Sequence, residues 1–166
     1  LVLAEFDLTD KTFELNKLAV DVARAACKRY ETADKPRFVI GSMGPGTRLI
    51  TLGNTTWEAM FESYLEQARG LLAGEPRPGS THGCDAFIIE TCQDILQIKC
   101  AVNACLAALG AMLDRETQGA GLVGSRRGES AGVAAVLAGI DAPAVFVELD
   151  PTPYSAGPGS YIGELV

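Results

Sequence analysis

Residues 36–46, PRFVIGSMGPG, and residues 85–94, DAFIIETCQD, decide how this chain is expected to fold. Each stretch is a short apolar run, rich in β-branched and aromatic residues, that ends abruptly at glycines or carboxylates. Such runs are typical of strands that are buried on both faces, as in parallel sheets. Because the carboxyl ends of parallel strands lie at one edge of a sheet, we expect both polar ends to face the same pocket.

Amphipathic segments precede, separate and follow these two strands. The spacing of apolar residues predicts helices over residues 10–30, 57–74 and 92–113. Candidate N-caps are Thr9 or Asp10 for the first helix and Thr55 or Thr56 for the second. Side chains expected to face the core are Phe13, Leu15, Leu18, Val22 and Ala25 or Ala26 in the first helix; Met60, Phe61, Tyr64, Leu65, Ala68, Leu71 and Leu72 in the second; and Ile95, Ile98, Val102, Cys105 and Leu109 in the third. This alternation predicts an α/β fold with parallel strands.

The pattern weakens beyond residue 113. A helix over residues 131–140 and a third strand over 143–150 are the elements we expect there, before a tail rich in proline and glycine. We therefore divide the chain into residues 1–113 and residues 114–166, a divergent and shortened continuation of the same domain. The link over residues 75–83 is long for a helix-to-strand connection, so we expect it to be a surface loop.

Composition narrows the classes of protein and partner. The chain has 166 residues, 48% of them hydrophobic, and a formal net charge of −7. That size suits one domain with a real core, and an acidic chain lacks the basic field that attracts nucleic acid. No apolar run approaches the roughly 20 residues that span a bilayer, so we expect no membrane partner and a cytoplasmic location. The absence of an initiating Met suggests a fragment or a processed chain.

The cysteines do not form a recognisable framework. Their number is five, without a CxxC pair, and the single histidine, His82, lies in the Pro/Gly/Ser-rich loop. We expect neither a disulfide scaffold nor a local zinc site, and we interpret the thiols as small buried side chains. Cys92 follows the second strand, but the only histidine lies in a distant loop, which argues against a Cys/His nucleophile.

Each strand end permits two interpretations. The stretch GSMGPG at residues 41–46 allows backbone N–H groups to approach an anionic ligand, or it is an ordinary tight turn. It is neither a Walker A loop nor a GxGxxG turn. Glu90 directly follows three apolar residues, where a carboxylate can bind an ammonium group or act as an acid or base. Alternatively, Glu90 caps or forms an ion pair with the following helix.

Four segments together resemble the homocysteine-binding domain of cobalamin-dependent methionine synthases. They are LVLAEFDLTDKTFELNKLAVDVARAA, KPRFVIGSMGPGTRLITLG, ESYLEQARGLLAG and GCDAFIIETCQDILQIKCAVNA. The resemblance runs from residue 1 to about residue 109 and is interrupted at residues 75–82. Order and spacing agree throughout, so the signal is more specific than a single motif.

The resemblance implies a (β/α)₈ TIM barrel that transfers a methyl group from methylcobalamin to homocysteine, giving methionine. It implies a catalytic zinc held by three cysteines, which lowers the pKa of the substrate thiol. By the same resemblance Glu90 binds the homocysteine ammonium group, and Gly41, Ser42 and Met43 line the same pocket. In full-length relatives the partners are domains for methylcobalamin and methyltetrahydrofolate.

Departures from the family pattern predict an incomplete (β/α)₈ barrel. The segments of the family's first two strands are absent before Leu1, and a further strand is largely deleted between Leu109 and Glu116. Asp150 stands where the first zinc cysteine is expected, and no Gly-Gly-Cys-Cys stretch precedes Val166. We therefore assign no catalytic residue and no metal ligand, and expect no zinc and no activity of this chain alone. The alternatives are a non-catalytic scaffold, an oligomerising module that associates through open sheet edges, or a degraded gene product.

Overall fold

The computed structural model of the chain describes residues 1–113 and 144–147. Helices and strands alternate along it as the sequence predicts. In chain order the elements are η1 (Leu3–Phe6), η2 (Thr9–Lys11), α1 (Thr12–Tyr30), β1 (Ile40–Met43), η3 (Ile50–Leu52), α2 (Trp57–Leu72), β2 (Ala86–Ile89), α3 (Ile95–Met112) and β3 (Ala144–Val147). The expected helix over residues 131–140, Asp150 and the tail lie outside the described residues.

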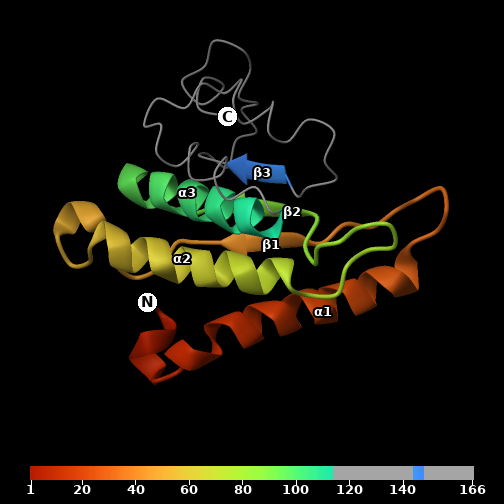
Figure 1. Cartoon of the computed structure of the whole chain (residues 1–166), viewed down its shortest axis with the longest axis horizontal. Coiled ribbons are helices and arrows are strands. Elements are labelled where there is room, and N and C mark those ends of the chain that lie inside the picture. Colours follow the sequence, from red (N-terminus) through yellow and green to blue (C-terminus); the bar gives the residue numbers. More distant parts are fainter. Residues whose placement is uncertain (114–143, 148–166) are drawn as a thin grey trace, which may run out of the picture.

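The described strands form one parallel sheet in the order β1-β2-β3 (Figure 1). Met43 pairs with Ile89, and Ile89 pairs with Val147, so all three strands end at the same edge. The α/β class with parallel strands is thereby confirmed, and β3 falls inside the range predicted for a third strand. That this sheet belongs to an incomplete TIM barrel remains a prediction.

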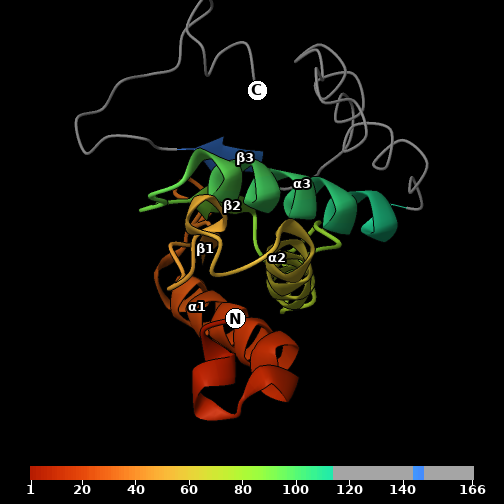
Figure 2. The ribbon, with the colours of Figure 1, turned by 90° about the vertical axis from the view of Figure 1, so that its left-hand side faces the viewer.

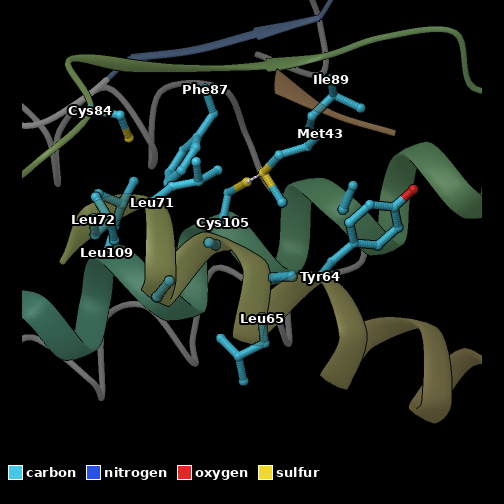
Figure 3. Packing of buried hydrophobic residues seen from close by; sticks show 14 of the residues in the cluster. Met43, Tyr64, Leu65, Leu71, Leu72, Cys84, Phe87, Ile89, Cys105 and Leu109 are labelled. Atoms are coloured by element: carbon cyan, nitrogen blue, oxygen red, sulfur yellow. Dashed lines mark hydrogen bonds between the residues drawn. The ribbon is translucent and has the colours of Figure 1, made fainter. Parts of the chain in front are cut away.

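The hydrophobic core lies between the sheet and helices α2 and α3. Met43, Phe87 and Ile89 project from the strands onto α2 and α3 (Figure 3). Their partners include Leu71 of α2 and Cys105 of α3, whose thiol donates to the Met43 sulfur at 3.4 Å. Alternation along a strand places these side chains on one face, which leaves the other face of β1 to Ile40 and Ser42.

Helices α2 and α3 begin at side-chain caps. Thr56 caps α2 by accepting a hydrogen bond from the Ala59 N–H at 3.2 Å, as predicted. Asp94 caps α3, which therefore begins at Ile95 rather than at residue 92. All the predicted core positions of α2 are buried except Phe61, which is half-buried. Of the five predicted in α3, only Cys105 and Leu109 are fully buried. The core face of α3 is made instead by small residues that allow close packing: Cys100, Ala101, Ala104 and Ala108.

Helix α1 forms as predicted, but its predicted core face is wrong. Helix α2 lies between α1 and α3 in both views (Figures 1 and 2), so α1 packs mainly against α2 and meets the sheet at its amino-terminal end, through Arg24. Its buried residues are Val20 and Arg24, whereas Leu18 and Val22 are 48% and 72% exposed. Phe13 and Leu15 are also exposed. The predicted N-cap is wrong too, because η2 precedes α1 and Lys11 holds the cap position without a side-chain hydrogen bond.

A buried ion pair holds α1 to the amino-terminal end of the sheet. The guanidinium of Arg24, 1% exposed, donates to Asp85 Oδ2 at 2.7 Å and to the Gly83 carbonyl at 2.7 Å. The same carboxylate accepts from the Val39 N–H at 2.8 Å and from Arg77 Nε at 3.2 Å. Asp85 therefore joins a helix, a loop and both strand starts at the edge opposite to the polar strand ends.

Helix α3 is the one described helix that is long and apolar enough to cross a membrane by length and composition. Half of that 18-residue window is buried inside the fold, against α2 and the sheet. Core helices share this composition, so the expectation of no membrane partner stays a prediction.

Candidate functional site at the carboxyl end of the sheet

Ser42 and Glu90 meet where β1 and β2 end. The Ser42 hydroxyl donates a hydrogen bond to Glu90 Oε1. Ser42 is exposed, and Glu90 is half-buried, so both groups are accessible from solvent. This contact confirms that the two polar strand ends predicted from the sequence converge at one edge of the sheet. Glu90 does not cap α3, since Asp94 occupies that position.

Gly41 and Met43 face the opposite side of the sheet from Ser42. Met43 is fully buried in the core, and a side chain added at Gly41 would lie 2.9 Å from the Leu71 side chain. Only the backbone of these two residues is therefore available to a ligand beside Ser42. The Met43 carbonyl accepts from the Glu90 N–H at 3.0 Å, so one side-chain and one main-chain contact join three of the four predicted site residues, Ser42, Met43 and Glu90.

The loop after β1 requires glycine where it passes Glu90. Gly44 has a φ of +104°, and a Cβ there would lie 2.5 Å from the Glu90 carbonyl oxygen. The following peptide bond, Gly44–Pro45, is cis. Thr91, directly after Glu90, has a φ of 57°, a left-handed conformation that is unfavourable for a β-branched residue. Strained backbone conformations such as that of Thr91 are common at functional sites, and this one lies directly after Glu90.

Asp94 ties the two strand-end loops together. Its Oδ1 accepts from the Leu96 N–H at 2.8 Å, and its Oδ2 accepts from both the N–H and the hydroxyl of Thr51 at 3.0 Å. Burial acts to raise the pKa of Asp94, but the hydrogen bonds from Thr51 and Leu96 outweigh it and hold the pKa below its ordinary value. We did not predict this role. The available signal was an aspartate directly before an apolar helical segment, the usual position of an N-cap.

The thiols are not arranged for nucleophilic or metal chemistry. Burial raises the pKa of Cys84 and Cys100 to about 12, and it also raises the pKa of Cys92 and Cys105. His82 lies in the predicted surface loop, but its side chain is buried, and its Nδ1 lies 2.9 Å from the Cys84 carbonyl oxygen. His82 and Cys84 precede β2, whereas Cys92 follows it, at the other end of the strand.

The described residues do not fit the zinc that the family resemblance implies. Within residues 1–113 and 144–147, no three His, Cys, Asp or Glu side chains come together as a metal site. Thiols whose pKa is raised by burial are also poor zinc ligands, because zinc binds the thiolate. We therefore derive no chemical step through zinc.

A small cavity adjoins the strand-end loops on the helix side. Its volume is about 170 Å³, and it lies between the amino-terminal residues 1–3, the start of α1, the loop at residues 44–48, α2 and Gln97 of α3. Gln67 lines it and donates to the Ser42 carbonyl at 3.3 Å. The side chains of Ser42 and Glu90 do not line this cavity.

Comparison with known proteins adds to this geometry. The family model for homocysteine S-methyltransferase matches residues 2–145, which include both strand ends. The methionine synthase of Mycobacterium leprae is 42% identical over 100 residues, covering 60% of this chain and 8% of that protein. The methionine synthase of Mycobacterium tuberculosis is 40% identical over 100 residues, with the same 60% and 8% coverage. The chain thus spans about 8% of the length of these relatives. The resemblance read from the sequence is confirmed.

Proposed function

We propose that this chain, which belongs to the homocysteine S-methyltransferase family, binds homocysteine at the Ser42–Glu90 edge of its sheet. The observation that carries the proposal is the hydrogen bond between Ser42 and Glu90, which brings the ends of two strands to one point. The activity that we propose for the domain is of the methionine synthase type: transfer of a methyl group to the homocysteine thiol, giving methionine. We propose a cytoplasmic setting for it.

Glu90 and Ser42 suit opposite parts of an amino acid. A carboxylate that accepts one hydroxyl hydrogen bond keeps further lone pairs free, so Glu90 can accept from the substrate ammonium group. The Ser42 hydroxyl then orients that carboxylate. Backbone groups of Gly41 and Met43 are the proposed neighbours of the rest of the substrate, since Gly41 has no side chain and that of Met43 is buried in the core.

Methyl transfer itself needs groups that the described residues do not supply. The substrate sulfur must be a thiolate at the moment it takes the methyl group, and the described residues hold no zinc site to lower the pKa of the thiol. Methylcobalamin and methyltetrahydrofolate, the cofactors that the resemblance implies, belong to other domains of longer relatives. We therefore propose substrate binding by this chain and expect no turnover by the chain alone.

Exposed apolar residues favour a second candidate function, self-association. Leu18 and Val22 of α1 are 48% and 72% exposed. Phe38 and Ile40, before and in β1, the edge strand of the sheet among the described residues, are 55% and 57% exposed. An uncovered strand edge with apolar neighbours is a typical pairing surface. Light scattering on the purified chain tests this alternative, which predicts a dimer or larger species and which a stable monomer contradicts.

Isothermal titration calorimetry with L-homocysteine tests the main proposal. Glu90→Gln removes the charge that pairs with the ammonium group, and we expect at least a tenfold loss of affinity, since hydrogen bonds to charged groups are worth about 1.5–3 kcal/mol. Asp34→Asn is the matched control, an exposed carboxylate on the amino-terminal side of β1. Equal affinity of Glu90→Gln and wild type would refute the proposal.

A further inference from the structure

The cavity beside residues 44–48 contains a polar side chain that the fold leaves without partners. Gln97 is fully buried, and within residues 1–113 and 144–147 neither its Nε2 nor its Oε1 has a hydrogen-bond partner. A buried polar group without a partner destabilises a protein, so an amide with two such atoms indicates a missing ligand.

Gln97 is held at the cavity wall by its place in α3. It lies in the first turn after the Asp94 cap, and its Nε2 lies 3.4 Å from the position of a Cβ at Gly46. Gly46 has a φ of +73°, so glycine is favoured there on conformational grounds as well. The amide therefore faces a loop that carries no side chain to meet it.

Tyr64 adds a second polar group to the same wall. Its ring packs at the border of the core cluster, with the hydroxyl directed away from the cluster (Figure 3). The hydroxyl is buried and makes no hydrogen bond of normal geometry. Its polar neighbour is the Cys92 thiol, which itself donates to the Glu90 carbonyl at 3.5 Å. Burial raises the pKa of Tyr64, so the hydroxyl keeps its proton and remains a donor.

Size and access limit what can enter. A cavity of about 170 Å³ exceeds the space of one water molecule but is smaller than a typical pocket for a drug-sized ligand. Its floor, made by Met60, Tyr64 and Gln97, is buried, whereas Gly46, Thr47 and Arg48 at its rim are exposed. A small solute can therefore enter past the rim, and it reaches the covered polar atoms of Gln97 where the loop at Gly46 shifts aside.

We propose that this cavity binds a small molecule through a primary carboxamide group that pairs with the Gln97 amide. A carboxamide offers a donor and an acceptor side by side, so it satisfies both Gln97 atoms at once, and its oxygen can also accept from Tyr64. The site is separate from the Ser42–Glu90 pair and does not depend on the proposed function.

Acetamide is the simplest probe, and N,N-dimethylacetamide is its matched control, because it has the acceptor but no N–H donor. Binding is followed by ¹H–¹⁵N NMR of the whole chain, with attention to the Gln97 side-chain NH₂ signals. We expect saturable shifts at Gln97 and residues 44–48 with acetamide, and an affinity about tenfold weaker for dimethylacetamide.

Substitutions test whether Gln97 itself is responsible for the acetamide shifts. Gln97→Met keeps the volume and removes both polar atoms, so we expect it to abolish the acetamide shifts. Gln93→Met, at an exposed glutamine directly before the cap of α3, is expected to leave them unchanged. Glu90→Gln is also expected to leave them unchanged, which separates this proposal from the homocysteine site. The proposal is overturned if the shifts do not saturate, if the two amides give equal responses, or if acetamide does not displace water bound at Gln97. The comparison of the two amides uses the wild-type chain, so it does not depend on whether a variant folds.

Discussion

Replacing Asp85 by asparagine is expected to destabilise the chain strongly, although the residue lies far from the candidate site. Arg24 is 1% exposed, and Asp85 is the one carboxylate that contacts it among the described residues. The substitution removes the balancing charge but leaves the Arg24 guanidinium buried. Breaking a buried pair in this way reduces the free energy of unfolding by about 3–5 kcal/mol.

The structure places that figure at the lower end of the range. Arg24 keeps its hydrogen bond to the Gly83 carbonyl, and an asparagine oxygen can still accept from the Val39 N–H. We therefore expect a loss of about 3 kcal/mol, a large part of the roughly 5–15 kcal/mol that stabilises a domain. Arg24 Nη1 already lacks a hydrogen-bond partner among the described residues, so the substitution weakens the contacts of a guanidinium that is not fully paired.

Urea denaturation followed by far-ultraviolet circular dichroism measures the effect. Glu14→Gln provides the control, since the Lys11–Glu14 pair is exposed and such pairs contribute about 1 kcal/mol or less. In a double-mutant cycle, Arg24→Met is expected to rescue much of the Asp85→Asn loss, because it removes the stranded charge. A loss below about 1 kcal/mol for Asp85→Asn, or no rescue by Arg24→Met, would refute the reasoning.

Three further predictions concern the strand ends. Asp94→Asn should destabilise the chain most near neutral pH. The pKa of Asp94 in the folded chain lies below its unfolded value of about 3.9. The stability that its carboxylate contributes is therefore complete above about pH 3.9 and is lost as pH falls through the folded pKa. Denaturation at several pH values checks this, and a difference in stability between wild type and Asp94→Asn that does not change with pH contradicts it. Gly44→Ala should reduce the melting temperature and homocysteine affinity together, since its Cβ meets the Glu90 carbonyl; unchanged values for both argue against that contact. Met43→Ala should lower the free energy of unfolding by about 2–5 kcal/mol, as measured in urea, and a loss under 1 kcal/mol would show that the core does not close around it.

The sequence predicted the helices and strands correctly where residues close together in the chain determine them. The strand ending at Met43 and the strand ending at Ile89 were short, apolar and bounded by turn residues, and the parallel order followed from their alternation with helices. Thr56 was recognised as a cap because a hydroxyl stood directly before an apolar periodic segment. The meeting of Ser42 and Glu90 followed from the common edge of parallel strands.

Tertiary contacts decided the features that the sequence did not reveal. The apolar face of α1 looked like a core face, but the helix packs on α2 through Val20 and the glycines of α2 and its following loop, and Leu18 stays exposed. The burial of Arg24 depends on Asp85, which lies 61 residues away in the chain. No local pattern indicates such a pair. The unpartnered amide of Gln97 was likewise invisible, because glutamine in a helix usually faces solvent.

Recognition of the homocysteine ammonium group by Glu90 can be measured in one calorimetric cycle. Wild type and Glu90→Gln are each titrated with L-homocysteine and with 4-mercaptobutanoate, which is homocysteine without its amino group. If Glu90 recognises the ammonium group, the wild type loses affinity when the amino group is absent, and Glu90→Gln binds the two compounds equally weakly. If the wild type binds both compounds equally, or if Glu90→Gln still prefers homocysteine to the same extent, the ammonium group is recognised elsewhere or not at all.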